Sequence, residues 1–167
     1  MQLQDFIPRT TYYLKEGDLE SVGTIITKTG DTEGFRFKNQ IDKNTFVELV
    51  GDMTVGKATK SAMGIVISRP ERSFQLAPMA EAELPELRFA TVTRFQPNNL
   101  YSLPLSDTNT KITAGDYLVI GDDGKLTKGT TSDSGCVAEE SKDANTGGYI
   151  EVSITAKTSI DVKTSSP

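Results

Sequence analysis

The chain has 167 residues, with 18 lysines and arginines, 23 aspartates and glutamates and no histidine, and its formal net charge is −5. This acidic balance disfavours nucleic acid and anionic membranes as partners, because both require a basic face. The lack of histidine excludes Ser/His/Asp and Cys/His catalysis and His-containing zinc sites. We therefore expect a protein that is not an enzyme and that has no cofactor or metal site.

Compartment signals in the sequence are equally sparse. Cys136 is the single cysteine and cannot form an internal disulfide, so no oxidising compartment is implied. The first residues, MQLQDFIPR, include an acidic side chain and no apolar core of a secretion signal. No apolar run approaches the ~20 residues needed to span a bilayer. We expect synthesis in a cytoplasm and no membrane association.

Residues 1–20 carry apolar and aromatic side chains without clear alternation, and Pro8 interrupts them. Two interpretations stay open for this segment. It is either a first strand packed into the core or an arm that docks on another subunit.

From residue 21 onward the sequence has the pattern of strands and turns. Short runs rich in Val, Ile, Thr, Phe and Tyr are separated by Gly, Asp, Asn and Pro. In GYIEVSIT (148–155) apolar and polar residues alternate, which predicts a strand with one buried face. The further predicted strands are 24–28, 45–50, 63–68, 89–95 and 116–120.

Two segments between these strands have other properties. Residues 28–38 combine basic and acidic side chains and predict a solvated hairpin face. Residues 78–87 favour a short helix that Pro85 ends, or a loop, and their glutamates are expected to face solvent. The predicted fold is all-β, a compact β-sandwich or small β-barrel of short antiparallel strands.

The stretch VGDMTVGKATKS (50–61) resembles a phosphate-binding loop, since Gly51 precedes Gly56-Lys57 at the required spacing. Ala58 stands where the loop needs Ser or Thr, and β-branched alternation follows where it needs a helix. We therefore interpret the stretch as a turn that leads into a strand. Lys57 is then expected on a solvated hairpin.

A second stretch, GDDGKLTK (121–128), shares Gly-Lys-x-Thr-Lys with the first, at 124–128 and 56–60. Gly-Ile-Val (64–66) follows one copy and Gly-Cys-Val (135–137) the other. This similarity predicts two related half-units. It places Cys136 at the position of Ile65, as a small buried hydrophobe. The aspartates at 116–123 lack the spacing of a Ca²⁺ loop and are expected to be solvated turn carboxylates.

The expected organisation has four parts. Residues 1–20 are the arm or first strand, and 21–96 are a first β half that includes the insertion near 78–87. Residues 97–157 form a second β half, and 158–167 form a polar tail that frays.

Residues 112–155, ITAGDYLVIGDDGKLTKGTTSDSGCVAEESKDANTGGYIEVSIT, carry a family resemblance. Their Gly115-Asp116 turn, their Asp-Gly-Lys hairpin at 123–125 and the strands at 135–138 and 148–155 resemble small head-decoration (cement) proteins of tailed bacteriophages and related capsid-fibre bases. The resemblance implies a capsid-surface protein, often trimeric, that bridges capsomers. It also implies a terminal arm along the major capsid protein, for which the candidate contact residues are Gln2, Leu3, Phe6, Ile7 and Pro8.

The leading hypothesis is a structural virion protein on the capsid exterior, with the major capsid protein and its own copies, in a homotrimer, as partners. The alternative is a fibre or tail adhesin that recognises a host-surface glycan, which predicts exposed aromatic side chains clustered on one loop face. A nucleotide hydrolase that uses residues 51–59 is the third and least supported class.

Overall fold

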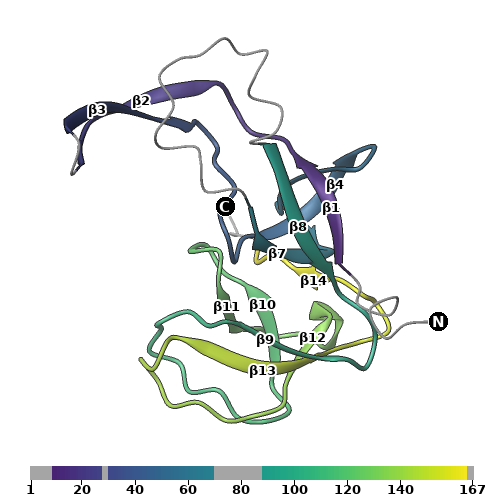
Figure 1. Ribbon diagram of the computed structural model, residues 1–167. Helices are drawn as coiled ribbons and strands as arrows, with labels where there is room; N and C mark the ends of the chain where they lie inside the picture. The colour runs from purple at the N-terminus through teal and green to yellow at the C-terminus, as the bar shows by residue number, and fades with distance from the viewer. Residues whose placement is uncertain (1–8, 28–29, 70–87, 165–167) are drawn as a thin grey trace, which may run out of the picture.

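The computed structural model describes residues 9–27, 30–69 and 88–164 (Figure 1). The arm residues 2–8 and the helix or loop expected at 78–87 lie outside this part of the chain. The described residues confirm an all-β fold. Its elements are β1 (Arg9–Leu14), β2 (Leu19–Thr27), β3 (Gly30–Phe37), β4 (Phe46–Gly51), β5 (Thr54–Lys57), β6 (Ser61–Ala62), β7 (Gly64–Ser68), β8 (Phe89–Arg94), β9 (Leu100–Pro104), β10 (Tyr117–Ile120), β11 (Leu126–Lys128), the 3₁₀ turn η5 (Ser132–Ser134), β12 (Cys136–Ala138), β13 (Tyr149–Ile154) and β14 (Ile160–Asp161).

Five strands close into a small barrel in the order β1-β5-β4-β7-β8, which we call the N-terminal barrel. β1 runs parallel to β5, and the other pairs are antiparallel. Alternate side chains point inward because successive residues of a strand face opposite sides. The buried cluster inside consists of Tyr12, Leu14, Ile41, Val47, Val55, Val66, Ala90 and Val92. Residues 9–14 are therefore a core strand.

The strands β9 to β13 form a second sheet in the order β11-β10-β12-β13-β9, which we call the C-terminal sheet. Its neighbouring strands are all antiparallel. A parallel bridge between Leu105, just after β9, and Leu126 on β11 joins the two edges of the sheet. The C-terminal sheet thus nearly closes into a second small barrel.

The two units have the same topology. In chain order, the five strands are β1, β4, β5, β7 and β8 in the N-terminal barrel and β9 to β13 in the C-terminal sheet. In each unit the first strand pairs with the fifth and lies parallel to the third. The second strand forms a hairpin with the third and also pairs with the fourth. The registers agree as well, because Leu14 pairs with Val55 in one unit and Leu105 with Leu126 in the other. The matched interior positions, all buried, are Tyr12 and Leu103, Leu14 and Leu105, Val47 and Leu118, Val55 and Leu126, Val66 and Ala138, Ala90 and Ile150, and Val92 and Val152.

The N-terminal barrel differs from the C-terminal sheet in two longer connections. Between β1 and β4 it carries the hairpin β2–β3, where the C-terminal sheet has the loop 105–116. Between β7 and β8 it carries residues 69–88, where the C-terminal sheet has the loop 139–148. The N-terminal barrel is therefore the same repeated unit with two insertions.

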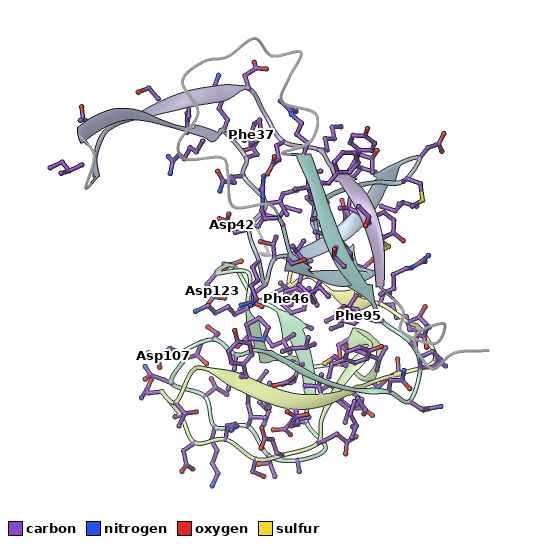
Figure 2. All side chains as sticks on the ribbon, in the orientation of Figure 1. Phe37, Asp42, Phe46, Phe95, Asp107 and Asp123 are labelled. Atoms are coloured by element: carbon purple, nitrogen blue, oxygen red, sulfur yellow. The ribbon has the colours of Figure 1, made fainter. Side chains whose placement is uncertain are left out.

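The two units share a core. Phe46 and Phe95 of the N-terminal barrel belong to the same buried cluster as the interior of the C-terminal sheet. Both side chains lie at the level where the N-terminal barrel meets the C-terminal sheet (Figure 2). Their ring centroids are 6.2 Å apart, and Phe95 meets Tyr101 edge-on at 5.4 Å. Each buried aromatic ring contributes about 1.5–3 kcal/mol by leaving water. The units are thus packed together by hydrophobic burial.

The C-terminal strand β14 ties the units to each other. Ile160 pairs with Ala62 of β6, and the Lys163 N–H donates to the Ile120 carbonyl of β10 at 2.8 Å. The Ile160 side chain is 0% exposed and lies in the shared core. The expectation of a fraying polar tail over 158–167 is therefore wrong for residues 158–163. Local composition favours a polar tail, but Ile160 is buried in the core that the two units share.

Candidate partner-binding surfaces

The stretch that resembles a phosphate-binding loop folds as the β4–β5 hairpin and the connection that follows it. Asp52 and Met53 form the turn, and Lys57 ends β5. The Thr59 hydroxyl and N–H both donate to the Glu48 carboxylate, at 2.9 and 3.0 Å. The interpretation as a turn that leads into strands is confirmed. The hydroxyl nearest to the motif's Ser/Thr position, that of Thr59, is thus held by a carboxylate of the same hairpin.

The repeat is present, but the sequence alignment of its copies is shifted. Strand pairing matches Lys57 with Lys128, since each lies opposite the equivalent core residue of the hairpin, Val47 or Leu118. Gly124-Lys125 instead forms the turn before β11, where Gly124 has φ 73°. The same pairing places Cys136 at the position of Gly64 and not of Ile65, which corrects the expected match.

Cys136 is a core residue, as expected. Its side chain is 0% exposed, and burial raises the pKa of its thiol to about 12. The neutral thiol is therefore the stable form at physiological pH, and it is a poor nucleophile.

The acidic side chains near β10 stabilise turns. Asp116 accepts a hydrogen bond from the Thr113 N–H and pairs with Lys128, and these contacts lower its pKa. The Asp123 carboxylate accepts from the Ser106 hydroxyl and the Lys125 N–H. Among the described residues, no group of three or more Cys, Asp or Glu is arranged to hold a metal ion.

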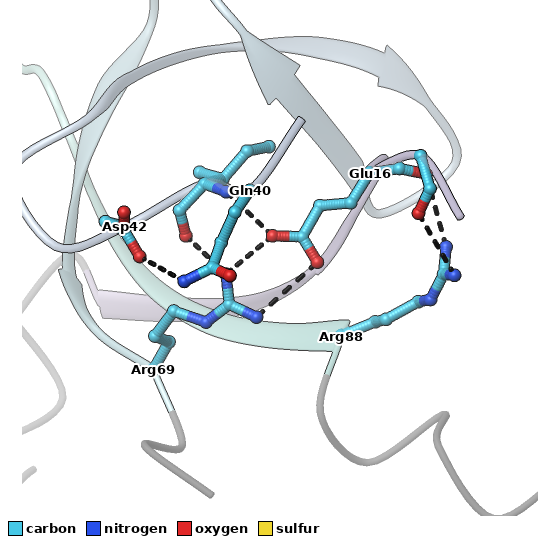
Figure 3. A network of polar contacts seen from close by, with 7 residues as sticks. Glu16, Gln40, Asp42, Arg69 and Arg88 are labelled. Carbon is cyan, nitrogen blue, oxygen red and sulfur yellow. Dashed lines mark hydrogen bonds and ion pairs between the residues drawn. The ribbon is translucent and has the colours of Figure 1, made fainter. Parts of the chain in front are cut away.

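A buried ion pair lies where the hairpin β2–β3 leaves the barrel (Figure 3). Glu16 Oε1 is 2.5 Å from Arg69 Nη1 and also accepts from the Ile41 N–H at 2.7 Å. Arg69 donates in addition to the Ile41 carbonyl at 2.6 Å. These contacts fix the segment after β1 to the segment after β7.

Arg88 completes this cluster. Its guanidinium lies 4.5 Å from the centroid of the Phe37 ring, at the end of β3, and it donates to the carbonyls of Glu16 and Gly17. Arg69 and Arg88 are the described residues on either side of 70–87. Both insertions of the N-terminal barrel therefore start from one place, which the two arginines hold together.

The hairpin itself extends away from the barrel (Figure 1). β2 and β3 pair with each other as a separate sheet of two strands, and Ile26 is 84% exposed. An isolated two-stranded hairpin is marginally stable in water. A groove of about 860 Å³ lies between the hairpin root and the β4–β5 hairpin. This geometry suits an element that is covered by a partner.

A second cleft, of about 450 Å³, lies between the two units. Lysines from both units line it, Lys43 and Lys57 from the N-terminal barrel and Lys125 from the C-terminal sheet. Asn44 donates across the boundary to the Tyr149 hydroxyl at 2.8 Å. The sequence patterns drew attention to Lys57 and Lys125 as parts of a repeat, but nothing local indicates that they meet in one cleft.

The expected contact residues Gln2, Leu3, Phe6, Ile7 and Pro8 precede the described residues. The chain enters the structure at Arg9, which pairs with Thr93 near the end of β8. The start of β1 thus lies near the boundary between the two units (Figure 1).

Comparison with protein-family models found no match, and comparison with curated proteins found none. Within the described ranges, no helix is long and apolar enough to cross a membrane.

Proposed function

We propose that the protein is a structural virion protein that binds the outer surface of a tailed-phage capsid and bridges neighbouring capsomers. The observation that carries the proposal is the repeated unit. The segment that resembles decoration proteins, 112–155, includes β10 to β13 of the C-terminal sheet, and the N-terminal barrel repeats its topology. One chain therefore presents two related modules, which suits a molecule that spans two sites on a surface.

The connection between the modules supports this role. A protein that bridges two capsomers resists outward pressure on the capsid only if its two modules are joined rigidly. Here the modules share a core around Phe46 and Phe95, and β14 contacts both of them. A flexible linker, in contrast, would let the modules separate under load.

Two elements are available for contacts with the capsid and between copies in a homotrimer. The first is the N-terminal segment with Gln2, Leu3, Phe6, Ile7 and Pro8, which is suited to pair with a sheet edge of the major capsid protein. The second is the hairpin β2–β3, whose root is anchored by the cluster of Glu16, Arg69 and Arg88.

Co-sedimentation with undecorated, expanded capsids of the source phage tests the proposal. The full chain is expected to pellet with the capsids, and a variant lacking residues 1–8 is expected to bind more weakly while keeping its β-sheet circular dichroism and melting temperature. Absence of co-sedimentation of the full chain at every salt concentration would rule out the capsid role. A collapse of the melting temperature on deletion would instead show that the segment belongs to the core.

The described surface gives the glycan-binding alternative less support. The exposed tyrosines Tyr13, Tyr117 and Tyr149 lie on β1, β10 and β13, so they do not share one loop face. Binding of the isolated protein to a glycan array would favour this alternative.

A further inference from the structure

The cleft between the two units is basic in a protein of net charge −5. Its charged lining comprises Lys43, Lys57, Lys125 and Asp123. Figure 2 places Asp123 and Phe46 near the level at which the two units meet. The cleft therefore combines a local excess of positive charge with walls contributed by two separate modules.

The lysines of this cleft differ from several others in the chain. Lys111, Lys128, Lys142 and Lys157 each form an ion pair with a carboxylate. Within the part of the chain that the structure describes, Lys43, Lys57 and Lys125 form none.

Among the described residues, the one acidic side chain that lines the cleft, Asp123, forms no ion pair with these lysines. Asp123 Oδ2 accepts from the Ser106 hydroxyl, and Oδ1 accepts from the Lys125 N–H at 3.1 Å. Both oxygens thus hold the turn before β11. The lysine ammonium groups remain available to an anionic group from outside the chain.

The remaining lining indicates the class of ligand. Phe46, Ile120 and Pro104 supply apolar wall, and Tyr149 is half exposed at the side. The volume of about 450 Å³ lies within the range of ligand sites, ~300–1,000 Å³. We propose that this cleft binds an acidic peptide segment, whose carboxylates meet Lys43, Lys57 and Lys125 while its apolar atoms lie against Phe46, Ile120 and Pro104.

A phosphate-rich ligand fits the cleft less well. Phosphate sites typically use several free backbone N–H groups or arginine forks. Here the N–H groups of Gly124 and Lys125 donate within their own turn, to the Gly121 carbonyl and to Asp123. This inference does not rest on the capsid role, since it concerns the chemistry of the segment and not its source.

Fluorescence anisotropy of the full chain with a fluorescein-labelled deca-glutamate peptide tests the proposal. The double variant Lys57→Glu/Lys125→Glu is expected to weaken binding by about tenfold or more, because two attractive contacts become repulsive. The matched control Lys111→Glu/Lys142→Glu changes the charge equally at two lysines that do not line the cleft, and its dissociation constant should stay within about twofold of the unmodified chain. The neutral variant Lys57→Gln/Lys125→Gln, with circular dichroism for all variants, separates lost binding from lost folding.

Three results would overturn the proposal. The first is no binding of the peptide at millimolar protein, and the second is equal weakening by the cleft and control variants. The third is displacement of the peptide by inorganic phosphate at matched ionic strength with a lower dissociation constant than that of the peptide, which would assign the cleft to phosphate.

Discussion

Glu16 Oε1 lies 2.5 Å from Arg69 Nη1, and the two side chains are 0% and 6% exposed. Removing one partner of such a pair leaves the other charge buried without compensation, which costs about 3–5 kcal/mol. We expect Arg69→Ala to lower the free energy of unfolding by about 3 kcal/mol, measured by urea denaturation.

The hairpin offers a matched control for this prediction. Arg36 pairs with Glu20 at 3.0 Å, but the side chains are 57% and 35% exposed. Arg36→Ala should therefore cost less than about 1 kcal/mol, because solvent screens exposed pairs. Equal losses from the two arginine variants would show that burial of Glu16 and Arg69 adds nothing.

Acid is expected to weaken the β4–β5 hairpin through Glu48. Burial raises the pKa of this carboxyl, but hydrogen bonds from the Thr59 N–H and hydroxyl and from the Lys60 and Ser61 N–H groups outweigh it, so the net pKa is below its ordinary value of 4.5. A lowered pKa stabilises the fold above the unfolded value, and this stabilisation is lost as pH falls through the folded pKa.

The free energy of unfolding should thus decline as pH falls below about 4.5, and Glu48→Gln should decline less steeply. At pH 7 the variant should lose less than about 1 kcal/mol, because Glu48 is only partly buried and solvent screens its interactions. Urea titrations at pH 7 and pH 3 measure both quantities. An equal decline of the free energy of unfolding in the unmodified chain and in Glu48→Gln would contradict this role of Glu48.

The β14 segment should contribute to global stability. Ile160 is 0% exposed and lies between the two units, so Ile160→Ala removes buried methyl groups and leaves a cavity. We expect a loss of about 2–4 kcal/mol in thermal or urea unfolding. Lys163→Ala, on an exposed side chain of the same segment, should change stability by less than about 0.5 kcal/mol. A neutral Ile160→Ala would mean that the C-terminus does not tie the units together.

Alanine substitutions at two glycines distinguish the stability cost of backbone strain from the stability cost of a steric clash. Gly124 and Gly135 both have positive φ, 73° and 87°. A Cβ at Gly124 has no atom within 4 Å, whereas at Gly135 it would lie 1.7 Å from the Ser159 carbonyl oxygen. Gly124→Ala should cost about 1–2 kcal/mol from strain alone. Gly135→Ala should cost clearly more, because the segment before β14 must move, and thermal melting of the two variants side by side measures the difference.

Local sequence patterns are sufficient to predict the properties that depend on neighbours along the chain. Alternation in 148–155 predicted a strand with one buried face, and the structure has β13 there with Ile150, Val152 and Ile154 buried. The lack of a helix after Gly56-Lys57 identified a turn that leads into strands. These features are local, because side-chain alternation and turn chemistry act over a few residues.

Which strands pair, and which distant side chains meet, depends on packing between segments that are far apart in the sequence. The shared Gly-Lys-x-Thr-Lys motif indicates a repeat and matches Lys57 with Lys125, whereas strand pairing matches Lys57 with Lys128, three positions further on. The two alignments differ because burial in the core, and not turn composition, sets the register of the strands. Ile160 looked like part of a tail, since nothing local shows the core that receives it. Lys57 and Lys125 lie 68 positions apart in the sequence and share a cleft only because hydrophobic burial packs one unit onto the other.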